Sequence, residues 1–205
     1  MLLASSTVIE DIRTLQNTGL AALGYFYCDF REYQKRDRRG ILSSLLCQLG
    51  EQSDAYSAIL SDFYEAHGRG IRHASDRLLT GCLEDMLTSL GWVPVYIIID
   101  ALDECPTTTD IPSPRENVLN LVKDLVNLGI RNLRICVTSR QEYDIETTLK
   151  PLAFHSISLE GESGQVKDMA EYIESVVNTD KVMRKWKDTN KQLVIEVLLK
   201  KADGM

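Results

Sequence analysis

The sequence predicts an α/β fold, in which a parallel β-sheet is covered by helices on both faces. Segments typical of strands alternate with segments typical of helices along most of the chain. Two of the strand candidates, Val95–Asp100 and Leu133–Ser139, are apolar at most positions. A strand that is apolar on both faces must be buried on both faces, as in a parallel sheet between two helical layers. We therefore expect a three-layer architecture.

The individual elements follow from the spacing of apolar residues. Helix candidates carry them three or four positions apart, whereas strand candidates are short and rich in aromatic or β-branched residues. The expected helices span residues 2–15, 41–49, 55–66, 75–90, 116–128, 168–177 and 191–202, and the expected strands span residues 22–30, 95–100, 133–139 and 155–159. The charged segment 31–40 is expected to be a solvated loop, with contact to phosphates or a partner as the alternative.

Length and composition indicate one domain over residues 1–205, with no second domain. The chain has 205 residues, of which 44% are hydrophobic and 26% are charged, so it can bury a substantial core. Its net charge of −7 disfavours nucleic acids and anionic membranes as partners. No apolar run approaches the roughly 20 residues that a membrane-spanning helix needs.

Cysteine usage indicates a reducing compartment. The five cysteines are scattered, and they form neither a CxxC pair nor a cluster with the three histidines. Reduced, mostly buried thiols in a cytoplasmic protein are therefore expected, without disulfides or a zinc site.

The first candidate site lies where the strand Val95–Asp100 ends. Ligands of parallel α/β sheets bind beyond the carboxyl ends of the strands, and Asp100 occupies such an end. Its carboxylate can hold Mg²⁺, usually through water. Asp103 or Glu104 can then orient or deprotonate an attacking water. The alternative is that Asp100 only ends the strand while the other two acids solvate the loop.

The second candidate site lies where the strand Leu133–Ser139 ends. Ser139 and Arg140 follow its apolar residues, and a guanidinium at this edge suits a terminal phosphate. A surface arginine in a salt bridge is the alternative interpretation. Two strands that end in "IIIDALDE" and "VTSR" favour a shared magnesium-nucleotide site.

These segments resemble fungal NACHT-type NTPases, which are STAND-class regulatory ATPases related to the nephrocystin-like N-terminal domain. The resemblance rests on "YFYCDFRE", "VYIIIDALDEC", "LRICVTSRQEYDI" and the final "KADGM", which occur in the order seen in that family. It implies a P-loop NTPase fold of the ASCE type, with Mg²⁺ and ATP as cofactors.

The resemblance also implies roles for single residues. Residues 95–104 correspond to the Walker B motif, in which Asp100 is the magnesium aspartate and Asp103 and Glu104 position water. Residues 133–140 correspond to the sensor-1 strand, in which Arg140, beside Ser139, senses the nucleotide.

The sequence departs from the family at the phosphate loop. Such a loop needs the pattern GxxxxGK[ST], whose backbone amides and lysine bind phosphate, and no Gly-Lys dipeptide occurs in residues 1–205. The resemblance aligns Met1 close to the end of that loop. We therefore expect a fragment that lacks the first (Walker A) strand, and we do not expect these residues alone to hydrolyse ATP.

The expected function is that of a NACHT/STAND-type nucleotide-binding regulatory switch in signalling or innate recognition, of which this chain is a fragment. Protein partners or self-association are expected through the parent protein. One alternative is a non-catalytic α/β interaction scaffold derived from an NTPase. Another is a truncated gene product without an independent role.

Overall fold

The computed structural model describes residues 2–29, 31, 37–67, 74–89, 91–109, 111–158 and 163–202. The chain divides into two compact units, Met1–Ala153 and Phe154–Met205. The first unit contains the sheet, and the second contains two α-helices. The expectation of one domain over residues 1–205 stays a prediction.

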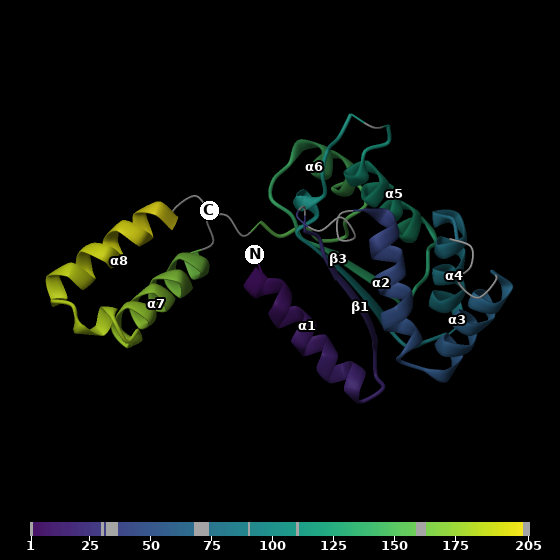
Figure 1. Ribbon diagram of the computed structural model, residues 1–205, viewed down its shortest axis with the longest axis horizontal. Coiled ribbons are helices and arrows are strands. Elements are labelled where there is room, and N and C mark those ends of the chain that lie inside the picture. Colours follow the sequence, from purple (N-terminus) through teal and green to yellow (C-terminus); the bar gives the residue numbers. More distant parts are fainter. Residues whose placement is uncertain are drawn as a thin grey trace. The chain divides into compact units, whose positions relative to one another are not determined.

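Helices separate the successive strands of the first unit, and three of them, α2, α3 and α4, lie between β1 and β2 (Figure 1). Its strands are β1 (Ala22–Tyr27), β2 (Val95–Asp100) and β3 (Leu133–Val137), and a short 3-10 helix, η2 (Leu102–Glu104), follows β2. Its α-helices are α1 (Leu2–Asn17), α2 (Arg38–Gly50), α3 (Asp54–Ala66), α4 (Asp76–Ser89), α5 (Pro114–Asn127) and α6 (Tyr143–Leu149).

The three strands form one parallel sheet in the order β1-β2-β3, so the α/β prediction is confirmed. In the register of the sheet, Tyr27 lies beside Asp100, and Ile99 lies beside Val137. The carboxyl ends of all three strands therefore meet at one edge of the sheet.

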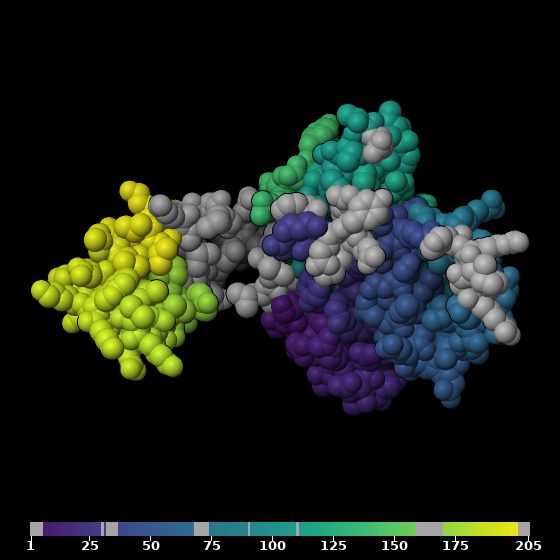
Figure 2. All heavy atoms as spheres, viewed as in Figure 1, coloured from purple at the N-terminus to yellow at the C-terminus, as the bar shows by residue number. Residues whose placement is uncertain are grey.

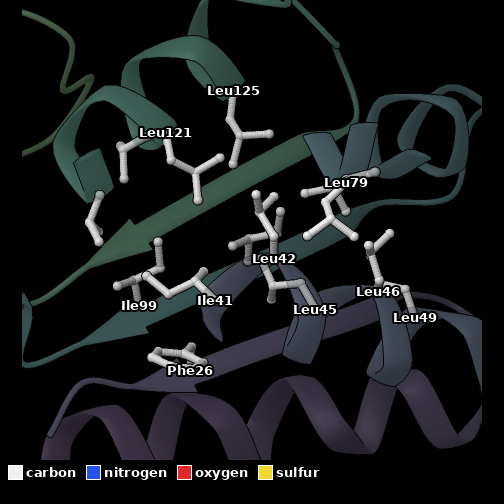
Figure 3. Packing of buried hydrophobic residues seen from close by; sticks show 14 of the residues in the cluster. Phe26, Ile41, Leu42, Leu45, Leu46, Leu49, Leu79, Ile99, Leu121 and Leu125 are labelled. Atoms are coloured by element: carbon white, nitrogen blue, oxygen red, sulfur yellow. The ribbon is translucent and has the colours of Figure 1, made fainter. Parts of the chain in front are cut away.

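Helices cover both faces of this sheet, which explains why successive residues of β2 before Asp100 are apolar. Ile97 and Ile99 belong to the large core beneath α2, α4 and α5 (Figure 3). Ile98 faces the other way and packs with Ile9 and Ile12 of α1. Successive side chains of a strand point to opposite faces, so both cores take residues from the same short segment. The space-filling view shows the purple atoms of α1 and the blue atoms of α2 and α3 on the visible face of this unit (Figure 2).

Helix α2 begins three residues earlier than the sequence predicts. Asp37 precedes it in an extended conformation and accepts a hydrogen bond from the amide of Gly40 at 2.8 Å. This cap satisfies one of the amides that the first turn of a helix leaves unpaired. The end of the expected charged loop is therefore helical, and residues 32–36 of that loop lie outside the described residues.

The second unit is a pair of packed helices, α7 (Ser163–Thr179) and α8 (Asp188–Ala202), joined through the 3-10 helix η3 (Met183–Lys185). Among residues 170–200, whose side chains are described, Val177 is buried, whereas several large apolar side chains are exposed. The exposed ones are Tyr172, Val182, Trp186, Leu193, Val197 and Leu198.

Two elements differ from the sequence-based expectation. The strand predicted at residues 155–159 is wrong, because residues 155–158 are irregular and exposed, and Leu159 lies outside the described residues. Helix α6 was not predicted, because seven mostly polar residues carry only a weak helical pattern.

Within the described residues, every helix is too short or too polar to span a lipid bilayer.

Candidate functional site

The parallel register brings the two predicted motifs together at the carboxyl edge of the sheet. Asp100 ends β2, and its side chain is almost completely buried at 1% exposure. One carboxylate oxygen, Oδ1, accepts a short hydrogen bond from the hydroxyl of Thr138, just beyond β3. The other, Oδ2, has no hydrogen-bond partner among the described residues. A buried, unpaired carboxylate oxygen is costly, so a water, another donor or a cation beside this atom would stabilise it.

The hydroxyl group of Thr138 connects the ends of β2 and β3, because it both donates and accepts a hydrogen bond. The hydroxyl donates to Asp100 and accepts from the amide of Ala101 at 3.0 Å. Its backbone continues the sheet, because Thr138 N donates to Ile99 O and Thr138 O accepts from Leu102 N, each at 3.0 Å. Thr138 therefore fixes the carboxylate of Asp100. The sequence places a hydroxyl residue here, but it does not show which side chain the hydroxyl meets.

A left-handed residue turns the chain from β2 into η2. Ala101 has φ 56° and ψ 46°, a conformation that costs a residue with a Cβ atom roughly 1–2 kcal/mol. The adjacent backbone holds the turn, because Glu104 N donates to Ala101 O at 2.9 Å and Leu102 is fully buried. The strained turn places Asp103 and Glu104 directly after the strand end that carries Asp100.

The structure separates Asp103 from Glu104, which the sequence treats as equivalent. The carboxylate of Asp103 accepts from the backbone amide of Arg140 at 3.0 Å, and it lies 3.5 Å from the guanidinium Nε of Arg140. The side chain of Glu104 is half-buried and makes no hydrogen bond or ion pair with the described residues. Asp103 is thus committed to a contact within the protein, whereas Glu104 remains available to a water or a ligand.

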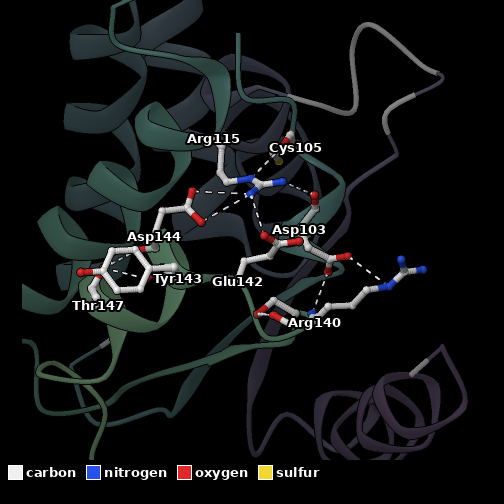
Figure 4. Close-up of polar contacts among 9 residues, drawn as sticks. Asp103, Cys105, Arg115, Arg140, Glu142, Tyr143, Asp144 and Thr147 are labelled. Carbon is white, nitrogen blue, oxygen red and sulfur yellow. Dashed lines mark hydrogen bonds and ion pairs between the residues drawn. The ribbon is translucent and has the colours of Figure 1, made fainter. Parts of the chain in front are cut away.

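Arg140 and Ser139 lie at the same edge, next to Asp103. The side chain of Arg140 is 79% exposed, and its terminal nitrogens point away from Asp103 (Figure 4). The hydroxyl of Ser139 donates to the backbone carbonyl of Arg140 at 2.8 Å, so it serves the local backbone. Arg140 thus combines one contact to Asp103 with an accessible positive charge.

Arg115 is a site residue that sequence reasoning missed. It stands in the first turn of α5, where Ser113 and Glu116 form a capping box. Its buried guanidinium donates to backbone carbonyls of the loop after β2, and it also faces acids of the segment after β3 (Figure 4). A signal was present in the sequence, because a cation in the first turn opposes the helix dipole and so needs another stabilising partner.

The surroundings of Asp100 are acidic and partly apolar. A hydrogen bond with Cys105 is the main cause that raises the pKa of the Cys28 thiol, with burial second and nearby Asp100 and Glu104 adding to it. Burial and the negative charge of Asp100 raise the pKa of Tyr27. All five cysteines are free thiols, and Cys28, Cys82 and Cys105 are buried.

Asp100 could hold a magnesium ion only through water, because it is a single carboxylate with one unpaired oxygen. In the described part of the chain, no three His, Cys, Asp or Glu side chains lie close enough to enclose a metal ion. Mg²⁺ does not need such a cage, because it retains several waters and takes one or two carboxylates plus phosphate oxygens. The unpaired Oδ2 of Asp100 fits an acceptor for such a metal-bound water.

Two cavities lie away from this edge. One, of about 510 Å³, lies where α2, α4 and α5 meet and is lined by polar residues that include Arg38, Asp76 and Asp124. The other, of about 290 Å³, lies beside β1 and is lined by residues that include Gln48 and Gln52. Neither contains Asp100 or Arg140.

Comparison with known proteins identifies the family. Residues 3–140 match the family model described as nephrocystin 3, N-terminal. The match includes all three strands and ends at Arg140, the last of the candidate residues. No curated protein and no solved structure matches the chain. Because the matched residues make up well over half of the sequence, the chain belongs to the nephrocystin 3 N-terminal family.

Proposed function

We propose that this chain is part of a NACHT/STAND-type nucleotide-binding regulatory switch, in which Asp100 holds Mg²⁺ of a bound nucleotide. The observation that carries the proposal is the buried carboxylate of Asp100, which has one oxygen fixed by Thr138 and the other unpaired. Family membership supports it, since the expected Walker B segment (residues 95–104) and sensor-1 segment (residues 133–140) both fall within the matched residues.

Each residue at the edge has a role that its contacts support. Asp100 would hold Mg²⁺ through water, and the bound metal would neutralise charge on the phosphates. Glu104, whose carboxylate is available, would position the attacking water. Asp103 would not contact that water directly. It would contribute only by holding Arg140 in place. Arg140 would contact a terminal phosphate with its exposed guanidinium, and Ser139 would support its backbone.

We expect residues 1–205 to bind ATP weakly on their own and not to hydrolyse it. A phosphate loop supplies charge-assisted hydrogen bonds at about 1.5–3 kcal/mol each, and no GxxxxGK[ST] pattern occurs in these residues. Three such bonds correspond to more than a thousandfold in affinity. A micromolar dissociation constant for ATP would contradict this expectation.

A non-catalytic interaction scaffold is the second candidate function. It is favoured by the engagement of Asp103 and Arg115 in contacts within the protein, which would stabilise this edge without any nucleotide. In either case we infer a cytoplasmic parent protein that acts through protein partners or self-association.

Electron paramagnetic resonance of free Mn²⁺, which replaces Mg²⁺ at oxygen ligands, tests the proposal. The titration is done with and without ATP on the wild type, on Asp100→Asn, and on Asp124→Asn as the matched control. Asp124 is also a carboxylate that contacts a neighbouring helix, but it lines the distant cavity. We expect Asp100→Asn to weaken Mn²⁺ binding at least about tenfold and Asp124→Asn to leave it unchanged. Equal binding by the wild type and Asp100→Asn would favour the scaffold.

A further inference from the structure

Arg115 makes more contacts to the loop after β2 than any role in helix α5 requires. Its Nε donates to Cys105 O at 2.9 Å, one Nη donates to Asp103 O at 2.5 Å, and its backbone amide donates to Pro106 O at 3.2 Å. One arginine thus holds three carbonyls within four residues of the loop. Its side chain is only 10% exposed, so water competes little for these carbonyls.

The same guanidinium also reaches the segment after β3. The other Nη lies 3.5 Å from Asp144 and 3.9 Å from Glu142 (Figure 4). Arg115 therefore lies between the loop that carries Asp103 and Glu104 and the segment that begins with Arg140.

Asp103 is the residue through which these contacts reach the candidate site. Its backbone carbonyl is held by Arg115, while its carboxylate is held by the amide and the guanidinium of Arg140. A shift of the Asp103 backbone must therefore move the Arg140 contact as well. It must also move Glu104, the next residue in η2.

Arginine is the side chain that this geometry requires. Its planar fork presents donors in several fixed directions, so one residue can bind two carbonyls and a carboxylate at once. A lysine in this position keeps the charge but has a single terminal nitrogen.

We propose that Arg115 is a positioning residue for the candidate site: it sets the place of Asp103 and Glu104 and couples them to Arg140. Its effect on metal binding rests on the proposed function, whereas its effect on the two loops does not.

The test combines amide NMR spectra with the Mn²⁺ titration in the presence of ATP, on the wild type, Arg115→Gln and Arg115→Lys. Arg38→Gln is the matched control, because Arg38 is a similarly buried arginine, 17% exposed, that joins α2 to Thr80 of α4 and Asp124 of α5. It has no contact with the candidate site among the described residues.

We expect Arg115→Gln to shift the amide signals of Glu104, Cys105 and Arg140 and to weaken Mn²⁺ binding at least about tenfold. Arg115→Lys should shift the same signals by less and restore binding in part. Arg38→Gln should leave both readouts at wild-type values, even if it lowers stability.

Wild-type positions of the Glu104 and Arg140 amides in Arg115→Gln would overturn the proposal, as would equal Mn²⁺ binding by Arg115→Gln and Arg38→Gln. If Arg115→Gln does not fold, Arg115→Lys decides by the same two amides. If the wild type itself fails to bind Mn²⁺ at Asp100, the proposed function fails, and the amide of Arg140 still decides the role of Arg115.

Discussion

The two outer strands of the sheet, β1 and β3, differ in how the backbone groups on their free sides are paired. On β1, the free backbone groups of Leu23 and Tyr25 are paired with the side-chain amides of Gln48, on α2, and Gln52, just after that helix. Gln52 accepts from Leu23 N at 2.9 Å and donates to Leu23 O at 2.6 Å, and Gln48 does the same for Tyr25 at 3.0 and 2.7 Å. These two glutamines take the place of a neighbouring strand.

The match between helix and strand follows from their repeats. Residues four apart on a helix are about 6 Å apart along its axis, and residues two apart on a strand are about 6.6 Å apart. Gln48 and Gln52, four positions apart across the end of α2, can therefore reach the backbone groups of Leu23 and Tyr25 at the free edge of β1.

The free side of β3 has no such cover. Thr138 N and Asn132 O pair with β2, so the backbone groups of Ile135 and Val137 face the opposite side. Within residues 111–158, only Leu133 is paired there: its O accepts from the side chain of Arg134 at 3.0 Å, and its N donates to Ile130 O at 3.2 Å. The backbone groups of the closed edge are thus paired within the protein, whereas the open edge adjoins the segment that carries Thr138 and Arg140.

The largest predicted effect is the difference in reaction rate between the exposed and the buried cysteine thiols. Cys136 on β3 and Cys47 on α2 are exposed, whereas Cys28, directly after β1, is buried with Cys82 and Cys105. Buried thiols react only when the structure opens, so the two exposed ones should be alkylated at least about a thousandfold faster. Mass spectrometry after timed alkylation measures this.

The pH dependence of that labelling has a definite sign. Burial, followed by the charge of Asp100, raises the pKa of Cys136, so less of its thiolate is present at neutral pH than for an ordinary thiol. Its alkylation should keep rising with pH beyond the ordinary thiol range. Fast labelling of Cys28 in the folded protein would contradict the comparison.

Removal of the closed edge should have the next largest effect. The double variant Gln48→Ala/Gln52→Ala leaves four backbone groups of β1 without their partners. We expect the free energy of unfolding to fall by about 2–4 kcal/mol, measured by urea denaturation.

Two single variants serve as controls for the double variant. Gln16 is a half-buried glutamine on α1 that lines the same cavity beside β1 as Gln48 and Gln52. Gln16→Ala should change the free energy of unfolding by no more than about 0.5 kcal/mol. Arg134→Ala on the open edge should also cost less than the double variant. If the double variant is as stable as the wild type, the glutamines do not close the edge.

The smallest predicted change in stability concerns Ala101, which directly follows β2, the strand between the two edges. Ala101→Gly removes the left-handed penalty at φ 56° but increases the entropy of the unfolded chain. We expect a gain of up to about 1 kcal/mol in the free energy of unfolding. The same change at the exposed Ala58, inside α3, should instead cost about 1 kcal/mol. A loss at both positions would contradict the strain assigned to Ala101.

Local patterns were sufficient for the parallel sheet and for the meeting of the two predicted motifs at one edge. The apolar runs of β2 and β3 predict buried strands, and their polar ends predict a shared edge, as the contact between Asp103 and Arg140 confirms. The functional roles of these residues stay predictions.

Contacts between distant segments were beyond the reach of those patterns. Arg115, Thr138 and the two glutamines meet partners that are 12 to 38 positions away. No periodicity of hydrophobic residues encodes such pairs. For the same reason the sequence could not separate Asp103 from Glu104, because the difference arises from Arg140, far along the chain.

The most direct test of the account is to locate a bound Mn²⁺ by paramagnetic broadening of amide signals, with ATP present. The account predicts that Asp100, Ala101 and Thr138 broaden first in the wild type, and that this broadening is lost in Asp100→Asn. Broadening that centres instead on the acidic cavity of Asp76, Glu84 and Asp124, or that persists unchanged in Asp100→Asn, would contradict it.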